Sequence, residues 1–228
     1  MQISLRNISS IIFRKPSKIL KEINSNSLMD KWLLENPSPE LFDTREELYE
    51  YINNSICQNA AIDYLEFGVA QGKSMKSWVR LNDSPDSKFY GFDTFEGLPE
   101  SFDRIRFTDP IGEFTNNGEF PKINDKRIGF NKGLFQETLP SFLDNYFPQN
   151  RLIIHNDSDL YTSSLYLLTM LNKFIIKGSI IIFDEFFCSS HEFQAFYDYV
   201  TSYQRSYKVL GATTNGQKRY TQIAIQII

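Results

Sequence analysis

The chain has 228 residues, with 24 Lys or Arg against 28 Asp or Glu, so its formal net charge is −4 at pH 7. This length fits one α/β domain better than two, and the charge lacks the basic excess typical of nucleic-acid-binding proteins, so no nucleic-acid partner is expected. The two cysteines lie far apart, no secretory signal is evident, and no segment approaches the roughly 20 apolar residues of a membrane span, which together predict a cytoplasmic protein.

The first part of the chain, residues 1–43, is expected to form an N-terminal arm or helical extension ahead of a domain at residues 44–228. Residues 1–23, MQISLRNISSIIFRKPSKILKEI, mix basic and apolar positions. This pattern is compatible with a short helix on a membrane surface, but it favours an arm that packs on the domain or on a partner subunit. Such an arm and an apolar C-terminal strand make a homodimer reasonable.

A helix is expected at the start of the domain, since Thr44 and Glu47 have the spacing of a capping box and apolar residues then recur at helical spacing. Short apolar or aromatic runs follow at residues 61–69, 88–93, 127–133, 151–157 and 178–187. Most of them lead into turn residues and then into helical periodicity. Short continuous apolar runs between helices are typical of a parallel sheet covered on both faces. The pattern predicts a doubly wound, Rossmann-like α/β fold.

The end of the chain breaks this alternation. Residues 207–214 and 219–228 read as two strands, and Asn215-Gly216 between them is a hairpin turn signal. We therefore predict a mostly parallel, seven-stranded sheet with a C-terminal antiparallel hairpin.

A long segment, Thr94 to Lys126, separates two of the predicted strands. It carries Phe102, Phe107, Phe114 and Phe120 among glycines and prolines. A loop of this length in a compact domain is usually functional or disordered, and its aromatic residues favour a lid over a linker. The phenylalanines are equally compatible with the core of that lid and with contacts to a substrate.

The turn after the first strand of the domain holds Glu66, Gly68 and Gly72. In a doubly wound sheet this turn is the usual site for a phosphate or a nucleotide. A dinucleotide-binding fingerprint would have glycine where Glu66 stands, and Gln71 lies near the place of its third glycine. A carboxylate repels a pyrophosphate but attracts an ammonium group. The turn therefore favours S-adenosylmethionine over NAD.

The motifs GFDTFEGLPE, KGLFQETLP, HNDSDLYTSS and GSIIIFDEF, in that order, resemble the macrocin O-methyltransferase family of the class I S-adenosylmethionine-dependent methyltransferases. The resemblance runs from about Tyr64 to about Phe187. It implies an enzyme that methylates a hydroxyl group of a sugar or of a glycosylated natural product, and therefore a small-molecule acceptor.

The resemblance also assigns residues to the cofactor site. Glu66, Gly68 and Gly72 would shape the pocket for the methionine part of S-adenosylmethionine, with Ser74 beside them. Asp93 would accept hydrogen bonds from the ribose hydroxyls, a task that suits a side chain with acceptors only.

Four acids follow two neighbouring predicted strands. The family's Asp-Gly-Asp-Leu-Tyr segment corresponds to residues 157–161, and its paired aspartates correspond to Asp184 and Glu185. The carboxylates of Asp157, Asp159, Asp184 and Glu185 should converge at one edge of the sheet, where they would repel one another and raise each other's pKa values. A divalent cation would relieve this repulsion, and ligands that are all oxygens suit Mg²⁺, with Mn²⁺ also possible.

We expect Asp157, Asp184 and Glu185 to bind this cation and Asp157 to take the proton of the acceptor hydroxyl. Glu is longer than the family's usual aspartate at position 185, which changes how it can reach a metal ion. For Asp159 and Glu185, a helix N-cap or a solvated loop acid is an equally good interpretation.

Three other side chains have open interpretations. His155 alternates within a buried strand, which favours a core histidine over a base. His191 lies at a predicted helix start, where it is either a surface residue or near the substrate. Tyr161 either lines the acceptor pocket or packs under the following helix.

Two functional alternatives remain beside sugar O-methylation. A catechol-type phenol O-methyltransferase would use a similar set of acids on an aromatic diol. A non-catalytic S-adenosylmethionine-binding protein would keep the cofactor residues but would not need the converging acids.

Overall fold

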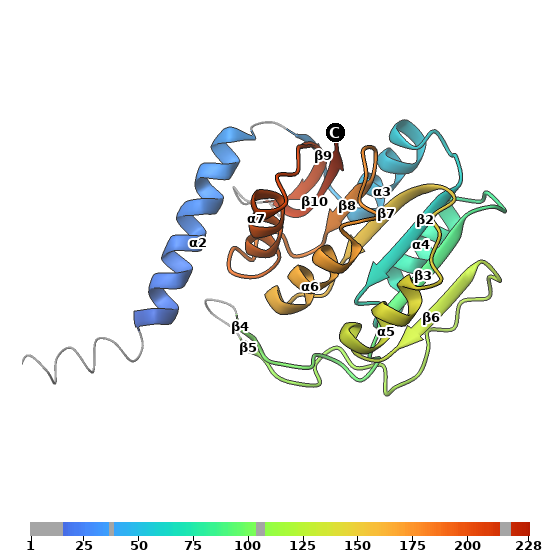
Figure 1. Cartoon of the computed structure of the whole chain (residues 1–228), viewed down its shortest axis with the longest axis horizontal. Helices are drawn as coiled ribbons and strands as arrows, with labels where there is room; N and C mark the ends of the chain where they lie inside the picture. Colours follow the sequence, from blue (N-terminus) through green and yellow to red (C-terminus); the bar gives the residue numbers. More distant parts are fainter. Residues whose placement is uncertain (1–15, 37–38, 104–107, 215–219) are drawn as a thin grey trace, which may run out of the picture.

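The computed structural model describes residues 16–36, 39–103, 108–214 and 220–228. An eight-stranded sheet lies at its centre, in the order β1-β9-β10-β8-β7-β2-β3-β6, and helices cover both faces (Figure 1). The strands of this sheet are β1 (Glu40–Phe42), β2 (Ile62–Phe67), β3 (Lys88–Asp93), β6 (Ile128–Lys132), β7 (Arg151–Asn156), β8 (Ile180–Phe183), β9 (Tyr207–Thr214) and β10 (Tyr220–Ile227). The helices are α2 (Pro16–Glu35), α3 (Arg45–Tyr51) with its continuation η1 (Ile52–Ile56), α4 (Lys73–Leu81), α5 (Phe135–Leu143), α6 (Tyr161–Leu171) and α7 (Glu192–Ser202).

The sheet confirms the predicted doubly wound class and all of the predicted strands. β6, β3, β2, β7 and β8 run parallel, while β10 lies antiparallel between β8 and β9. The sheet has one strand more than the seven predicted. This strand, β1, comes from the expected N-terminal arm and pairs in parallel with β9. Three residues are too few to show a strand period, which is why the sequence did not predict it. The hairpin signal Asn215-Gly216 and residues 1–15, which were read as part of the arm, lie outside the described residues.

Two apolar cores form on the two faces of the sheet, because side chains alternate along each strand. Leu65 and Phe67 of β2 face the core under α5, α6 and α7, whereas Ile62 and Tyr64 face the core under α3 and α4. The predicted capping box is present: Thr44 accepts from the Glu47 backbone, and Glu47 accepts in return from the Thr44 backbone.

The helix α2 lies beside α7 (Figure 1). The edges of the Trp32 ring approach the aromatic core around Phe193 and Phe196, and Trp32 Nε1 donates a hydrogen bond of 2.7 Å to the Tyr207 hydroxyl. Part of the expected arm therefore packs on the domain. Within the described residues, no helix is long and apolar enough to cross a lipid bilayer.

Candidate active site

A cavity of about 920 Å³ opens at the carboxyl ends of β2, β3, β7 and β8. This is the edge of an open α/β sheet at which ligands bind, and the volume is typical of small-molecule sites. Several predicted site residues line it: Gly68, Asp93, Asp157, Asp159, Asp184 and Glu185. The predicted cofactor residues Glu66, Gly72 and Ser74 are not part of its lining.

Asp93 holds in place the glycine turn, which is the turn after β2 that contains Gly68 and Gly72. Its Oδ2 accepts hydrogen bonds of 2.7 Å from the backbone N–H groups of both Val69 and Ala70, and its Oδ1 accepts one of 2.6 Å from Phe95. Each carboxylate oxygen has more than one acceptor site, so hydrogen bonds to a ribose remain compatible with this arrangement. The sequence predicted the ribose contact, which stays a prediction, and missed this positioning role.

Gly68 and Gly72 both have left-handed backbones, with φ of +89° and +69°. A Cβ atom on Gly68 would lie 1.9 Å from the carbonyl oxygen of Asp157, so only glycine lets the turn after β2 approach the end of β7. Gly72 precedes α4 and lies under Pro121 of the long loop, whose Cβ would be 2.8 Å from an added Cβ. The two glycines therefore shape the turn, and only Gly68 reaches the cavity.

Glu66 and Ser74 lie behind the cavity wall. Glu66 is 1% exposed and accepts a hydrogen bond of 2.9 Å from the Tyr64 hydroxyl. Burial, together with the charges of Asp184 and Asp93, raises the pKa of Glu66 to about 8, against the lowering effect of the Tyr64 bond. Ser74 is also buried and accepts from the Tyr49 hydroxyl. Their contact with the methionine part of a cofactor stays a prediction.

The raised pKa of Glu66 makes folding stability depend on pH. Between the ordinary pKa of 4.5 and the folded value of about 8, the unfolded chain releases the Glu66 proton while the folded protein keeps it. The free energy of unfolding should therefore fall as pH rises through this range, by up to about 1.4 kcal/mol per pH unit. Glu66→Gln lacks this titration. Its free energy of unfolding, measured with urea, should therefore rise relative to that of the wild type between pH 5 and pH 8. The exposed Glu119→Gln is the control, and identical pH profiles for Glu66→Gln and the wild type would contradict the assignment.

Asp157 presents a carboxylate to the cavity at the end of β7. Burial and the neighbouring carboxylates of Asp184 and Asp159 raise the pKa of Asp157 well above its usual range. Within the described part of the chain, no hydrogen-bond or ion-pair partner of this carboxylate is found. The ionised form of Asp157 is therefore a strong base that a cation would stabilise.

Asp184, by contrast, is surrounded by donors. Burial raises its pKa, but the hydrogen bond and charge of His155 and the charge of Arg45 outweigh this effect and lower it. The Asp184 Oδ2 lies 3.3 Å from an Arg45 nitrogen, and Oδ1 accepts a hydrogen bond of 3.1 Å from Gln222. Asp184 is thus held ionised beside Asp157. Arg45 is a cavity residue that the sequence did not single out.

The closest set of possible metal ligands is His155, Asp157 and Asp184, whose ligand atoms all lie within 4.8 Å of one another. Glu185, the predicted third ligand, is not in this set. It lines the cavity, and its backbone N–H donates to the buried carboxylate of Glu192. Metal binding by Glu185 stays a prediction. His155 is fully buried and hydrogen-bonded, as expected of a core histidine, yet it also belongs to the acidic cluster.

Tyr161 and His191 do not line the cavity. The Tyr161 hydroxyl donates to Asp198 of α7, so this side chain packs between helices. His191 immediately precedes α7, as predicted, and its Nε2 is paired with the backbone carbonyl oxygen of Asp103 at 2.8 Å. Its ring also packs edge-on against Phe102. The structure thus places His191 as a support for the long loop.

The long loop lies across the cavity. Part of it forms a short hairpin of β4 (Phe102–Asp103) and β5 (Thr108–Asp109). Leu98 and Phe102 pack in a small apolar cluster with Leu160 and Cys188, and the carboxylate of Glu100 accepts a hydrogen bond from Thr162 of α6. Phe102 belongs to the lid core, and Phe114 lines the cavity. Phe107 lies outside the described residues.

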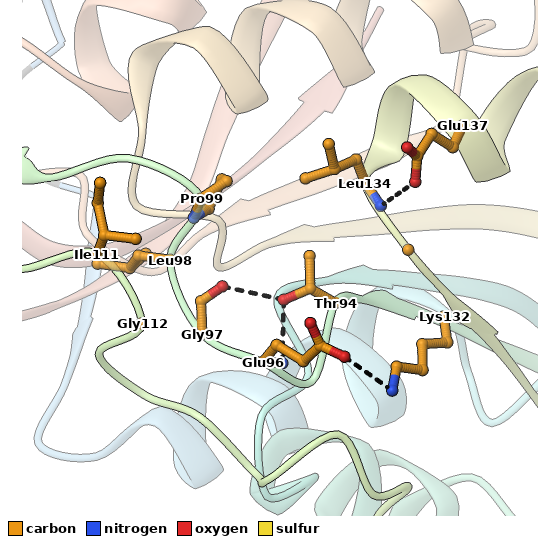
Figure 2. Close-up of a pocket in the computed structure, with 11 residues that line it drawn as sticks. Thr94, Glu96, Gly97, Leu98, Pro99, Ile111, Gly112, Lys132, Leu134 and Glu137 are labelled. Carbon is orange, nitrogen blue, oxygen red and sulfur yellow. Dashed lines mark hydrogen bonds and ion pairs between the residues drawn. The ribbon is translucent and has the colours of Figure 1, made fainter.

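A smaller cavity of about 340 Å³ lies between this loop and the turn after β6. Figure 2 shows that Thr94 donates to the Gly97 carbonyl and that Lys132 forms an ion pair of 3.1 Å with Glu96. These contacts hold the start of the loop, residues 94–97, against the end of β6.

We expect the long loop to become more ordered when the site fills, since it then excludes water from the reaction. Amide hydrogen exchange across residues 94–126 should slow when cofactor and acceptor are both present. Thr162→Val, which removes the partner of Glu100, should weaken this protection, while the exposed Thr169→Val on the same helix should not. Complete protection in the free protein would instead identify a static insertion.

Comparison with known proteins shows the family of this chain and similar folds. The model of the macrocin-O-methyltransferase (TylF) family matches residues 44–209. Similar solved structures include the O-methyltransferase NovP, with 20% identity over 80% of this chain and 78% of that chain at a TM-score of 0.57. The calicheamicin methyltransferase CalS11 has 20% identity, covers 99% and 94%, and has a TM-score of 0.59.

An O-methyltransferase from Bacillus cereus in complex with SAH has 17% identity over 98% of this chain and 96% of that chain, with a TM-score of 0.54. At these identities the structures support the fold. A search of the curated proteins finds no match.

Proposed function

The chain belongs to the macrocin O-methyltransferase family, and we propose that it methylates a hydroxyl group of a sugar or glycosylated natural product with the help of a divalent cation. As a member of this family it is an S-adenosylmethionine-dependent O-methyltransferase, which sets aside the non-catalytic alternative. The sugar acceptor is supported by CalS11, whose apo structure is described as that of a TDP-rhamnose 3'-O-methyltransferase and aligns with this chain at 18% identity.

One observation carries the proposal: a single cavity is lined by the glycine turn, by Asp93 and by Asp157. A cofactor held at the glycine turn and at Asp93 would therefore have its reactive part in the same cavity as the Asp157 carboxylate. Bringing an acceptor, a methyl donor and a base together in one geometry is what an in-line methyl transfer requires.

The residues present fit S-adenosylmethionine, which supplies an electrophilic methyl group on its sulfonium sulfur. Asp93 lines the cavity, and its Oδ1, which accepts one hydrogen bond from Phe95, can accept another from a ribose hydroxyl. The left-handed turn at Gly68 lets backbone atoms approach the cofactor. Buried Glu66 places a carboxyl group behind this turn, where a nearby cationic tail would favour its ionised form.

A divalent cation fits the acidic cluster, because the Asp157 carboxylate has no hydrogen-bond or ion-pair partner among the described residues and the Asp184 carboxylate is held ionised. Such an ion would make an acceptor hydroxyl more acidic. Asp157 and Asp184 would hold it, with Glu185 close by in the cavity lining. Arg45 already lies against one oxygen of Asp184 and supplies part of the positive charge there.

In the proposed reaction, Asp157 accepts the proton of the acceptor hydroxyl. The hydroxyl oxygen forms a bond to the methyl carbon while the carbon–sulfur bond breaks, so the products are a methyl ether and S-adenosylhomocysteine. Asp157 lines the cavity in which the acceptor would bind, so its carboxylate is placed to take the hydroxyl proton while the cation makes that hydroxyl more acidic. The long loop would exclude water during the transfer.

The acceptor class can be tested directly by measuring S-adenosylhomocysteine formation with nucleotide sugars, glycosylated natural products and catechols. We expect turnover with a sugar-bearing acceptor and little with catechol. Turnover with catechols alone would favour the phenol O-methyltransferase alternative. A phenol O-methyltransferase would use a similar acid cluster. The panel of acceptors therefore distinguishes it from a sugar O-methyltransferase better than a substitution of any of the acids does.

A further inference from the structure

His155 lies where it can act as a metal ligand together with the two aspartates. His155 lies in β7 and Asp157 directly follows this strand, and one possible ligand atom of each lies within 4.8 Å of the other. Asp184 directly follows the neighbouring strand β8, and the His155 Nε2 lies 3.4 Å from Asp184 Oδ1. Ligands of one divalent cation lie about 3 to 4.5 Å apart at metal–ligand distances of about 2.0–2.3 Å, which the observed spacing within 4.8 Å approaches.

The other ring nitrogen of His155 is held by a buried hydrogen-bond chain. The Tyr64 hydroxyl lies 2.9 Å from Glu66 Oε2 and 2.6 Å from His155 Nδ1, so in the tautomer that carries its proton on Nδ1 the imidazole donates to Tyr64 and Tyr64 donates to Glu66. Both Tyr64 and His155 are fully buried. Histidines that bind metals typically donate their second N–H to a carboxylate or a similar acceptor, which fixes the tautomer. In this tautomer the chain through Tyr64 to Glu66 has that form, and the Nε2 lone pair is free to bind a metal ion beside Asp184.

Two features of the cluster call for a cation between these groups. The Nε2 atom and the Asp184 Oδ1 atom lie 3.4 Å apart, a separation at which one metal ion can bind both. Within the described residues, the Asp157 carboxylate on the other side has no hydrogen-bond partner. The Tyr49 hydroxyl, 3.5 Å from Nε2, and Arg45, beside Asp184, are the other polar groups at this point.

We propose that His155 is a nitrogen ligand of the catalytic cation, and that the site therefore prefers Mn²⁺ or another transition ion over Mg²⁺. The inference rests on the proposed function for the presence of a cation, and it replaces the ligand set of oxygens alone expected from the sequence. Imidazole is a good ligand for transition ions, whereas Mg²⁺ prefers oxygen ligands and keeps much of its water. One nitrogen in the ligand set thus shifts the choice of metal.

The chain has only two histidines, which makes a spectroscopic test decisive. Pulsed electron paramagnetic resonance of the protein loaded with Mn²⁺ should show the coupling of an imidazole nitrogen to the metal. The signal should persist in His191→Gln and disappear in His155→Gln. His191 lies outside the cavity lining, so its variant is the matched control.

Metal titration gives a second measurement. His155→Gln should lower the ratio of Mn²⁺ affinity to Mg²⁺ affinity by about tenfold or more. Tyr64→Phe keeps His155 but removes the group that orients it, so Mn²⁺ affinity should fall by about 10–100-fold. Circular dichroism and S-adenosylhomocysteine binding would verify that each variant is folded. If His155→Gln does not fold, the wild type and His191→Gln still decide the question.

Bound Mn²⁺ without an imidazole signal, or no binding of Mn²⁺ at all, would overturn the inference. An unchanged ratio of affinities in folded His155→Gln would do the same. Mn²⁺ held by oxygens alone would leave the proposed methyl transfer intact. Conversely, an imidazole signal in a protein that methylates no sugar acceptor would support the ligand assignment and contradict the proposed function.

Discussion

Asp157→Asn is expected to lower the turnover number with a sugar acceptor by about 10³-fold, within the range found for loss of a general base. The amide has the shape of the carboxylate, but it takes no proton from the acceptor hydroxyl and is a weaker ligand for a cation. The cofactor is expected at Asp93 and the glycine turn, so S-adenosylhomocysteine affinity should stay within about twofold of the wild type. Product formation and calorimetric titration measure the two effects.

Asp198→Asn is a suitable control for this variant. Asp198 lies in α7 and pairs with Tyr161, outside the cavity lining, so the same chemical change there should leave turnover nearly unaltered. If Asp157→Asn kept more than about a tenth of the wild-type turnover, the assignment of Asp157 as the base would be wrong.

Gly68→Ala should damage both stability and cofactor binding. The new Cβ would lie 1.9 Å from the Asp157 carbonyl oxygen, and the φ of +89° is unfavourable for any residue with a Cβ. Backbone strain and overpacking together should cost about 2–5 kcal/mol of unfolding free energy. The displaced backbone belongs to the glycine turn, where the cofactor is expected to bind. The affinity for S-adenosylhomocysteine should therefore fall by at least about tenfold, which is a loss of roughly 1.4 kcal/mol of binding free energy.

Gly178→Ala separates the cost of backbone strain from the cost of overpacking. Gly178 has a similar φ of +94°, but nothing lies within 4 Å of an added Cβ. It should therefore show only the cost of the left-handed backbone, about 1–2 kcal/mol, and unchanged cofactor affinity. Equal losses in the two variants would show that the close approach of Gly68 to Asp157 is unimportant. Urea unfolding and calorimetry are the measurements.

The sequence predicted most of the sheet because its strands are continuous apolar runs separated by turn and helix signals. Residues 151–157 and 178–187 are examples, and they become the adjacent strands β7 and β8. The short strand β1 lacks such a signal. It is fixed only by its pairing with β9, which lies far away in the chain.

The convergence of Asp157 and Asp184 was predictable, since neighbouring parallel strands end at the same edge of a sheet. The contacts around them were not, because they depend on side chains from distant segments. Arg45 reaches Asp184 from α3, and His155 is oriented by Tyr64 of β2. Glu66 belongs to the expected turn, but its position behind the cavity wall depends on how deeply β2 is buried.

The most direct test of the account is methyl transfer from labelled S-adenosylmethionine to a sugar acceptor in excess chelator, and again after a divalent cation is restored. The cation should act at Asp157 and Asp184, so the wild type should lose turnover in chelator and recover it with Mn²⁺, while S-adenosylhomocysteine affinity stays nearly constant. Asp157→Asn should not recover. Full transfer by the wild type in excess chelator would contradict the account, because Asp157 would then act without a cation.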